Sequence, residues 1–176
     1  MIKRIGHTRS LFLVGEIDSE TSTSAVTELL TMASESEEEI TIYINSPGGS
    51  VIDGLAIFDT INYIKPKVST VVIGLAASMA SFLSSSGQKG MRYALPNSEF
   101  LIHQPLGGID YGQQTEIQIV ADHIKKTREK LESILAKNTG KSIEQIHIDC
   151  ERDKYLSAKE ALDYGLIDKI IGSDNE

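Results

Sequence analysis

The fold is most constrained by a pair of segments that recurs three times in the first half of the chain: a short apolar segment typical of a strand, then apolar residues at helical spacing. The strand-like segments lie at 11–14, 40–44 and 71–73. In the second, isoleucines alternate with Thr41 and Tyr43, which is the pattern of a half-buried strand. Because successive parallel strands need a crossover, usually a helix, this order predicts an α/β fold with a parallel sheet and covering helices.

The rest of the chain predicts shorter elements and one long amphipathic helix, which is either a projecting arm that binds a partner or a cover for a longer sheet. Asp18 or Ser19 is expected to cap the first helix, and Ser142 with Gln145 fits a capping box, as does Ser157 with Glu160. The later elements are predicted as strands at 92–95 and 99–102, the long helix at 113–137, two short helices after Ser142 and Ser157, and a strand at 166–171.

Composition limits the class of protein. The chain has 176 residues, of which 40% are hydrophobic and 24% charged, which suits one domain with a sizeable core. Its net charge of −8 argues against a nucleic-acid or membrane surface, and the apolar run at 11–14 is too short for a signal peptide or a membrane span. The only cysteine, Cys150, forms no internal disulfide and is either a nucleophile or, more typically, a small buried apolar side chain. We therefore expect a cytoplasmic protein.

The segment Gly74-Leu-Ala-Ala-Ser78-Met79 predicts a strand–turn–helix that presents one hydroxyl group. Small side chains around Ser78 would let another backbone approach it, and the start of the helix supplies N–H groups without intrahelical partners. Phe82 and Leu83 are expected on the buried face of that helix. Spacing alone leaves two interpretations open, a nucleophilic serine and a serine that caps the helix.

A nucleophilic serine needs a histidine to take its proton and a carboxylate to orient that histidine. His103 follows a predicted strand, and three acids lie together between the predicted short helices. Spacing does not choose among these acids, nor does it exclude the other histidines. The candidates for the acid are Asp149, Glu151 and Asp153. The candidates for the base are His103 and, as alternatives, His7, His123 and His147.

The loop Ser46-Pro-Gly-Gly-Ser50 follows the second strand, and its paired glycines could point backbone N–H groups at an anion. A phosphate-binding loop would end in Gly-Lys-Ser/Thr, whereas Gly49 is followed here by Ser50 and Val51. An oxyanion site beside a serine fits the loop better, with an ordinary turn as the alternative.

Several motifs in order resemble the ClpP family, the proteolytic subunits of Clp proteases, over residues 11–171 without large gaps. They are Tyr43-Ile-Asn-Ser-Pro-Gly-Gly-Ser-Val51, Gly74-Leu-Ala-Ala-Ser-Met79, Arg92-Tyr-Ala-Leu-Pro-Asn-Ser98, His103-Gln-Pro-Leu-Gly-Gly108, and Glu151-Arg-Asp153 with Ser157-Ala.

The resemblance implies a serine endopeptidase that cleaves peptides and unfolded proteins. By position in the motifs, Ser78 matches the nucleophile, His103 the general base and Asp153 the acid that orients it. The backbone N–H groups of Gly49 and Met79 match the oxyanion donors. The resemblance implies no metal or organic cofactor, and ATP would be used by the partner unfoldase rather than by this chain. The residues expected to contact substrate are Gly48, Gly49, Pro105 and Leu106.

The resemblance further implies a crotonase-like ββα spiral with a projecting strand-helix handle. Residues 1–176 would form one peptidase domain, with its head at 1–106 and 138–176 and its handle at about 107–137. Family members form two stacked heptameric rings that receive polypeptide from a Clp-family AAA+ unfoldase. Glu116 is expected to pair with Arg152 across the rings.

Two departures from the family pattern suggest a divergent second copy that could work in mixed rings with another ClpP. The segment before Leu11 is shorter than usual, which would affect docking of the unfoldase, and Ile109-Asp110-Tyr111 makes the turn near the handle one residue longer. Two alternative functions stay open: a silent or partner-dependent structural subunit, and an acyl-CoA enzyme of the same crotonase-like fold. The serine and histidine motifs argue against the second.

Overall fold

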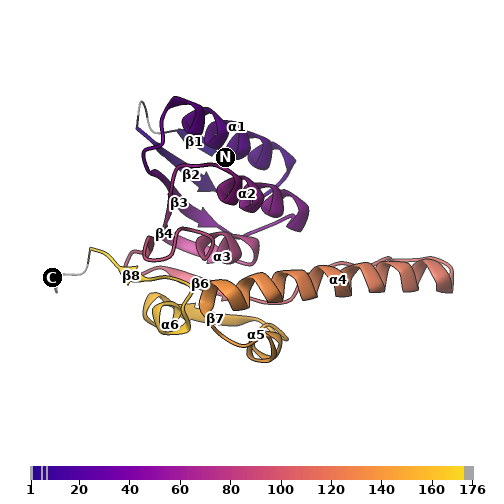
Figure 1. The fold of residues 1–176 in the computed structure, drawn as a ribbon. Coiled ribbons are helices and arrows are strands. Elements are labelled where there is room, and N and C mark those ends of the chain that lie inside the picture. Colours follow the sequence, from indigo (N-terminus) through magenta and orange to yellow (C-terminus); the bar gives the residue numbers. More distant parts are fainter. Residues whose placement is uncertain (1, 5, 7, 173–176) are drawn as a thin grey trace.

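The computed structural model describes residues 2–4, 6 and 8–172 (Figure 1). The elements form an 8-stranded sheet with order β1-β2-β3-β4-β5-β8, to which β6 is added beside β4, and β7 beside β6. Their bounds are β1 Ile2–Arg4, β2 Ser10–Val14, α1 Ser19–Glu35, β3 Ile40–Ser46, α2 Val51–Tyr63, β4 Val68–Ala77, α3 Met79–Ser84, β5 Arg92–Ala94, β6 Glu99–Ile102, α4 Gln114–Thr139, α5 Ile143–Asp149, β7 Lys154–Ser157, α6 Ala158–Tyr164 and β8 Lys169–Ile170.

The sheet is mostly parallel, which confirms the predicted α/β class. Pairs β2–β3, β3–β4, β4–β5, β4–β6 and β5–β8 are parallel, while β1–β2 and β6–β7 are antiparallel. The helices α1 and α2 lie beside each other against the sheet, and α3 follows below α2 in the view of Figure 1. Asp18 caps α1, as predicted, by accepting a hydrogen bond from the Thr21 amide at 2.8 Å.

The central strands show why the sequence folds this way. In β3 the isoleucines Ile40, Ile42 and Ile44 are buried, while the residues between them are partly exposed. The first five residues of β4 are all buried, as expected for a strand covered on both faces. β4 is longer than predicted and includes Gly74, whose φ is +141°. The expected turn therefore begins only at Ser78.

Some sequence-based boundaries were wrong. α3 ends at Ser84 rather than near residue 87, and β8 covers two residues of the predicted strand at 166–171. Leu166 and Ile167 are fully buried outside that strand, so their apolar character reflects packing rather than strand pairing. β1 and β7 were not predicted. Both are short antiparallel strands: β1 pairs with the nearby β2, while β7 depends on β6, which is distant in sequence.

The helix α4 projects far beyond the sheet, as Figure 1 shows, which favours the predicted arm over a cover for a longer sheet. Its only buried residues, Glu132, Leu135 and Ala136, lie in its C-terminal part, while Ile117 and Ile119 near its free end are 47% and 68% exposed. Gly140, with φ +78°, ends the helix. No helix in the described part of the chain is both long and apolar enough to cross a membrane.

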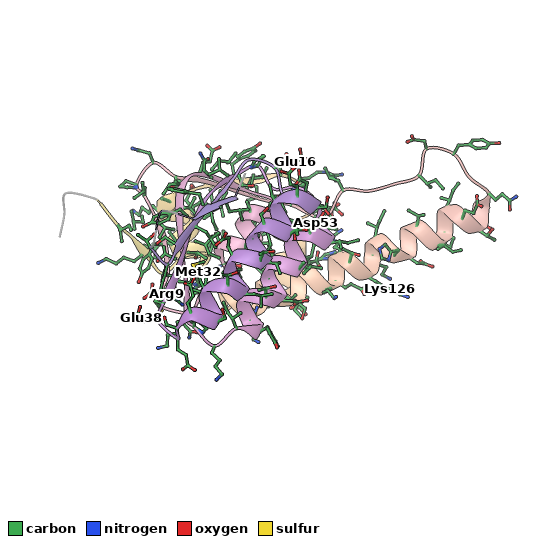
Figure 2. All side chains as sticks on the ribbon, turned by 90° about the horizontal axis from the view of Figure 1, so that it is seen from above. Arg9, Glu16, Met32, Glu38, Asp53 and Lys126 are labelled. Atoms are coloured by element: carbon green, nitrogen blue, oxygen red, sulfur yellow. The ribbon has the colours of Figure 1, made fainter. Side chains whose placement is uncertain are left out.

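The expected strand of the handle is absent. Residues 103–113 have no regular secondary structure and run along α4 to its tip, where the chain turns back, in both Figure 1 and Figure 2. A strand needs a neighbouring backbone to pair with, and here the neighbour is a helix whose own backbone groups are already bonded. At the opposite end of the molecule, Arg9 reaches the C-terminus of α1 (Figure 2) and donates to the Met32 carbonyl at 2.8 Å.

Candidate active site

Ser78 lies between the end of β4 and the start of α3 in an unusual backbone conformation. Its φ of +55° is the only positive φ of a non-glycine residue in the described chain. Such a conformation costs about 1–3 kcal/mol and persists only where the surroundings enforce it. The Ser78 amide donates to the Leu101 carbonyl at 2.8 Å, and its carbonyl accepts from the Phe82 amide at 3.1 Å. Its side chain makes no capping hydrogen bond, so the capping interpretation was wrong.

The Gly48–Gly49 loop packs directly against Ser78. A Cβ on Gly48 would lie 2.5 Å from the Ala77 carbonyl oxygen and 2.8 Å from the Ser78 Cβ, and one on Gly49 would lie 2.2 Å from the Ile17 carbonyl oxygen. Both glycines have positive φ, +89° and +150°. Only glycine fits these two positions, because the backbone of Gly48 lies directly against Ser78 and that of Gly49 directly against Ile17.

The amides of Gly49 and Met79 have no hydrogen-bond partner in the part of the chain that the structure describes, whereas the Gly48 amide donates to Ser46 Oγ at 3.1 Å. Met79 is the first residue of α3, whose N-terminal amides have no intrahelical acceptor. Two unpaired amides on the loop and on the helix that flank Ser78 can both donate to a negatively charged oxygen.

His103 is brought to Ser78 by strand pairing. β6 pairs in parallel with the end of β4, with Ala77 opposite Leu101, so the two strands end together. Ser78 and His103 line one pocket with Met79 and Pro105, and apolar side chains such as Val51 and Phe82 form its other walls. The His103 side chain is 13% exposed.

Asp153 reaches His103 through β7, which was not predicted. β7 pairs antiparallel with β6, with Lys154 opposite Ile102, and this register places the preceding Asp153 beside His103. The His103 Nδ1 lies 3.8 Å from the Asp153 Oδ1, and the Asp153 side chain is 62% exposed.

The other two acids have different partners. Asp149 accepts hydrogen bonds from Lys154 and, at 2.9 Å, from the Tyr164 hydroxyl. Burial alone would raise the pKa of Asp149, but these hydrogen bonds and one from Gln145 hold it below its usual value. Glu151 binds Arg128 at 3.0 Å. Among the three acids, Asp153 is the one next to His103.

The other histidines lie elsewhere. His147 contacts Glu132, with 3.0 Å between Nδ1 and Oε2, and His123 is exposed on α4. His7 lies outside the described residues.

Cys150 is 4% exposed, and burial, aided by Glu132 and Asp149, raises the pKa of its thiol to about 12. Because a cysteine reacts as the thiolate, Cys150 is a buried apolar side chain rather than a nucleophile.

The remaining predicted site residues lie near the pocket or on the arm. Leu106 is 84% exposed and, with Pro105, borders a groove between the start of α2 and α4. The Glu116 carboxylate accepts from the Gln113 amide at 2.8 Å at the start of α4. The Arg152 side chain is 86% exposed and contacts Glu151. The pairing of Glu116 with Arg152 of another subunit stays a prediction.

An α/β fold whose strained serine lines a pocket with a histidine, near two backbone amides that have no partner among the described residues, is typical of hydrolases with a serine nucleophile. Comparison with known families places the chain within this class: it belongs to the Clp protease family, whose model matches residues 1–174. This is a family of serine peptidases. The roles of Ser78, His103, Asp153, Gly49 and Met79 remain predictions.

One group of residues was not found from the sequence. Arg128 and Glu132 on α4 form an ion pair, 2.6 Å apart, in which Glu132 is buried and Arg128 half-buried. Arg128 also contacts the loops that follow β6 and precede β7. The pair's spacing of four residues is common on solvated helix faces, so the sequence carries no signal that distinguishes this pair.

Proposed function

We propose that this chain is the serine endopeptidase subunit of a self-compartmentalising Clp protease, which hydrolyses peptides and unfolded polypeptides. The observation that carries the proposal is the strained backbone of Ser78, whose φ is +55°. Its hydroxyl makes no capping hydrogen bond to the helix, and Ser78 lines the same pocket as His103. A structural serine would not need this conformation, whereas a nucleophile must be exposed to both its base and its substrate.

In the proposed mechanism, Ser78 Oγ attacks the peptide carbonyl as His103 takes its proton. The Nδ1 of His103 faces Asp153, which leaves Nε2 for this transfer. The amides of Gly49 and Met79 donate to the oxyanion of the tetrahedral intermediate. His103 then protonates the leaving amine, and a water molecule activated by the same histidine hydrolyses the acyl-enzyme.

Family membership supports the proposed partners. Members typically form rings that work with AAA+ partners. We propose that α4 and residues 103–113 are the handle that joins two heptameric rings, with 1–106 and 138–176 as the head. Tyr111, which is 95% exposed at the tip, and Ile119 would be covered by another subunit. The unfoldase would use the ATP and deliver polypeptide to Ser78.

One observation favours a second candidate, a subunit that is silent until it assembles with a partner. The 3.8 Å between His103 and Asp153 exceeds hydrogen-bond distance, and Asp153 is largely exposed. Catalytic hydrogen bonds are often long in free enzymes and shorten in the substrate complex. We therefore propose that this contact closes in the active assembly. The acyl-CoA alternative has no such support, and family membership favours a peptidase.

The test uses the purified chain, its mass in solution and a fluorescent fluorophosphonate. We expect a ring-sized particle that is labelled and cleaves a short peptide, with both activities lost in Ser78→Ala. Ser81→Ala is the matched control, because Ser81 lies on the same helix and its buried hydroxyl has no hydrogen-bond partner in the described chain. A ring that neither labels nor cleaves would favour the silent subunit.

A further inference from the structure

The Arg128 guanidinium is the centre of a compact polar cluster where α4 enters the head. Its Nε donates to Glu132 Oε1 at 2.6 Å, and its Nη1 donates to the Gln104 side-chain oxygen at 2.8 Å. Its Nη2 donates to Glu151 Oε2 at 3.0 Å and to the His147 carbonyl at 3.1 Å. One planar group therefore binds three separate parts of the chain.

Two of these partners are close neighbours of the candidate catalytic residues. Gln104 follows His103 directly, and Glu151 precedes Asp153 by two positions. The same two loops are also joined without Arg128: the Gln104 amide donates to the Cys150 carbonyl at 2.7 Å, and its side-chain nitrogen donates to the Glu151 carbonyl at 2.9 Å. Arg128 adds the side-chain contacts that fix how these loops are oriented.

The cluster holds the guanidinium in one orientation. The side chains of Arg128 and Glu132 are only 16% and 7% exposed. His147 Nδ1 lies 3.0 Å from the second carboxylate oxygen of Glu132, so both oxygens have partners. A buried ion pair is weak support for stability, since apolar side chains of similar volume often serve as well. A planar group with several donors at fixed angles is suited instead to holding two loops in register.

We propose that Arg128 is a positioning residue that fixes His103 relative to Asp153 and so sets the rate at which Ser78 reacts. This inference rests on the proposed function. The nucleophile is held by the backbone of the sheet, whereas His103 and Asp153 lie on loops beyond strand ends. Their separation of 3.8 Å is too long for a hydrogen bond, so neighbouring contacts must align the two side chains. In the described chain Arg128 makes no hydrogen bond or ion pair with either residue, although it lines the same pocket as His103, and it acts through Gln104 and Glu151.

The test compares Arg128→Met with Lys125→Met, which removes a 74% exposed cation from the same helix. In Arg128→Met, the rate constant for fluorophosphonate labelling of Ser78 and the kcat for a short peptide should each fall about 10- to 100-fold, because small misplacements of catalytic groups have effects of this size. The KM should change less than about twofold, and all sites should still label eventually. Arg128→Lys should recover only part of the rate, because an ammonium group lacks the planar fork.

Three results would contradict the inference. If Arg128→Met labels at the wild-type rate, Arg128 does not position the triad. If Arg128→Met lowers both the fraction of labelled sites and the amount of ring-sized particle, while the remaining sites react at the wild-type rate, the role of Arg128 is structural. If the wild-type chain itself fails to label and cleave, the proposed function is overturned and the positioning role with it.

Discussion

The two halves of the candidate active site are built differently. The nucleophile half is main chain: Ser78 sits at the end of the central strand β4, and the Gly48–Gly49 loop fits against it with no space for a side chain. The base and acid half lies on loops at the end of β6 and the start of β7, joined by side-chain hydrogen bonds to α4. The first half is therefore fixed by folding of the sheet, while the second depends on side-chain contacts that another subunit or a substrate can alter.

The largest expected effect distinguishes Asp153 from Asp149, two of the acids of the second half. Asp153→Asn should lower kcat for a short peptide by on the order of 10⁴-fold, because an amide no longer holds the histidine in the required tautomer. Asp149→Asn should lower the melting temperature instead, since Lys154 and Tyr164 lose their partner, and should leave kcat below the melting temperature nearly unchanged. Equal loss of kcat in both variants would contradict the assignment of the acid.

The first half is tested by Gly48→Ala. Its new Cβ would push on the Ala77 carbonyl oxygen and on Ser78, and we expect kcat to fall by about 100-fold or more, the size of effect seen on removing one oxyanion donor. Gly90→Ala is the control: Gly90 has the same φ of +89°, but no atom lies within 4 Å of the added Cβ. It should cost about 1–2 kcal/mol of folding free energy and leave kcat unchanged. An active Gly48→Ala would show that the close fit is unnecessary.

A third prediction separates stability of the sheet from reactivity of Ser78. Arg92, which is 3% exposed, binds Asp168 and joins β5 to the segment before β8. Burial alone would raise the pKa of Asp168, but Arg92 and the Gly90 and Arg92 amides hold it below its usual value of 3.8. Asp168 is thus charged in the folded state at neutral pH. Its contribution to the free energy of unfolding is fully present above about pH 4, and it is lost as the pH falls through the lowered pKa of the folded state.

Asp168→Asn should therefore lower the free energy of unfolding at pH 7 by about 3 kcal/mol, measured by urea denaturation. The difference from wild type should shrink as the pH falls below about 4. The labelling rate of Ser78 at temperatures where both proteins are folded should not change. A difference that stays constant down to pH 2 would contradict the role of the ion pair.

The smallest expected effect concerns Cys150, which lies under the second half of the site. With its pKa raised to about 12, its thiol should not react with iodoacetamide at pH 7.5 in the native protein and should react fully in denaturant. Mass spectrometry of the intact chain measures this directly. Alkylation of the native protein would show that the loops around Cys150 open more readily than the first half of the site.

Local patterns in the sequence determined much of the fold. Alternation of apolar residues predicted β3, and the capping residues Asp18, Ser142 and Ser157 predicted where three helices begin. These signals work because a strand or a helix end depends on residues within a few positions of each other. The sequence likewise singled out Ser78 and the Gly48–Gly49 loop, and motif resemblance supplied the expected His103 and Asp153.

The tertiary structure alone decided what depends on residues distant in sequence. It placed Asp153 beside His103 through pairing of β6 with β7, and it gave Asp149 and Glu151 other partners. It also showed that the Ser78 side chain does not cap its helix, and that Arg128 binds Gln104, which is 24 positions away in the sequence. Such contacts are set by strand register and by how a long helix docks, and no short pattern in the sequence records either one.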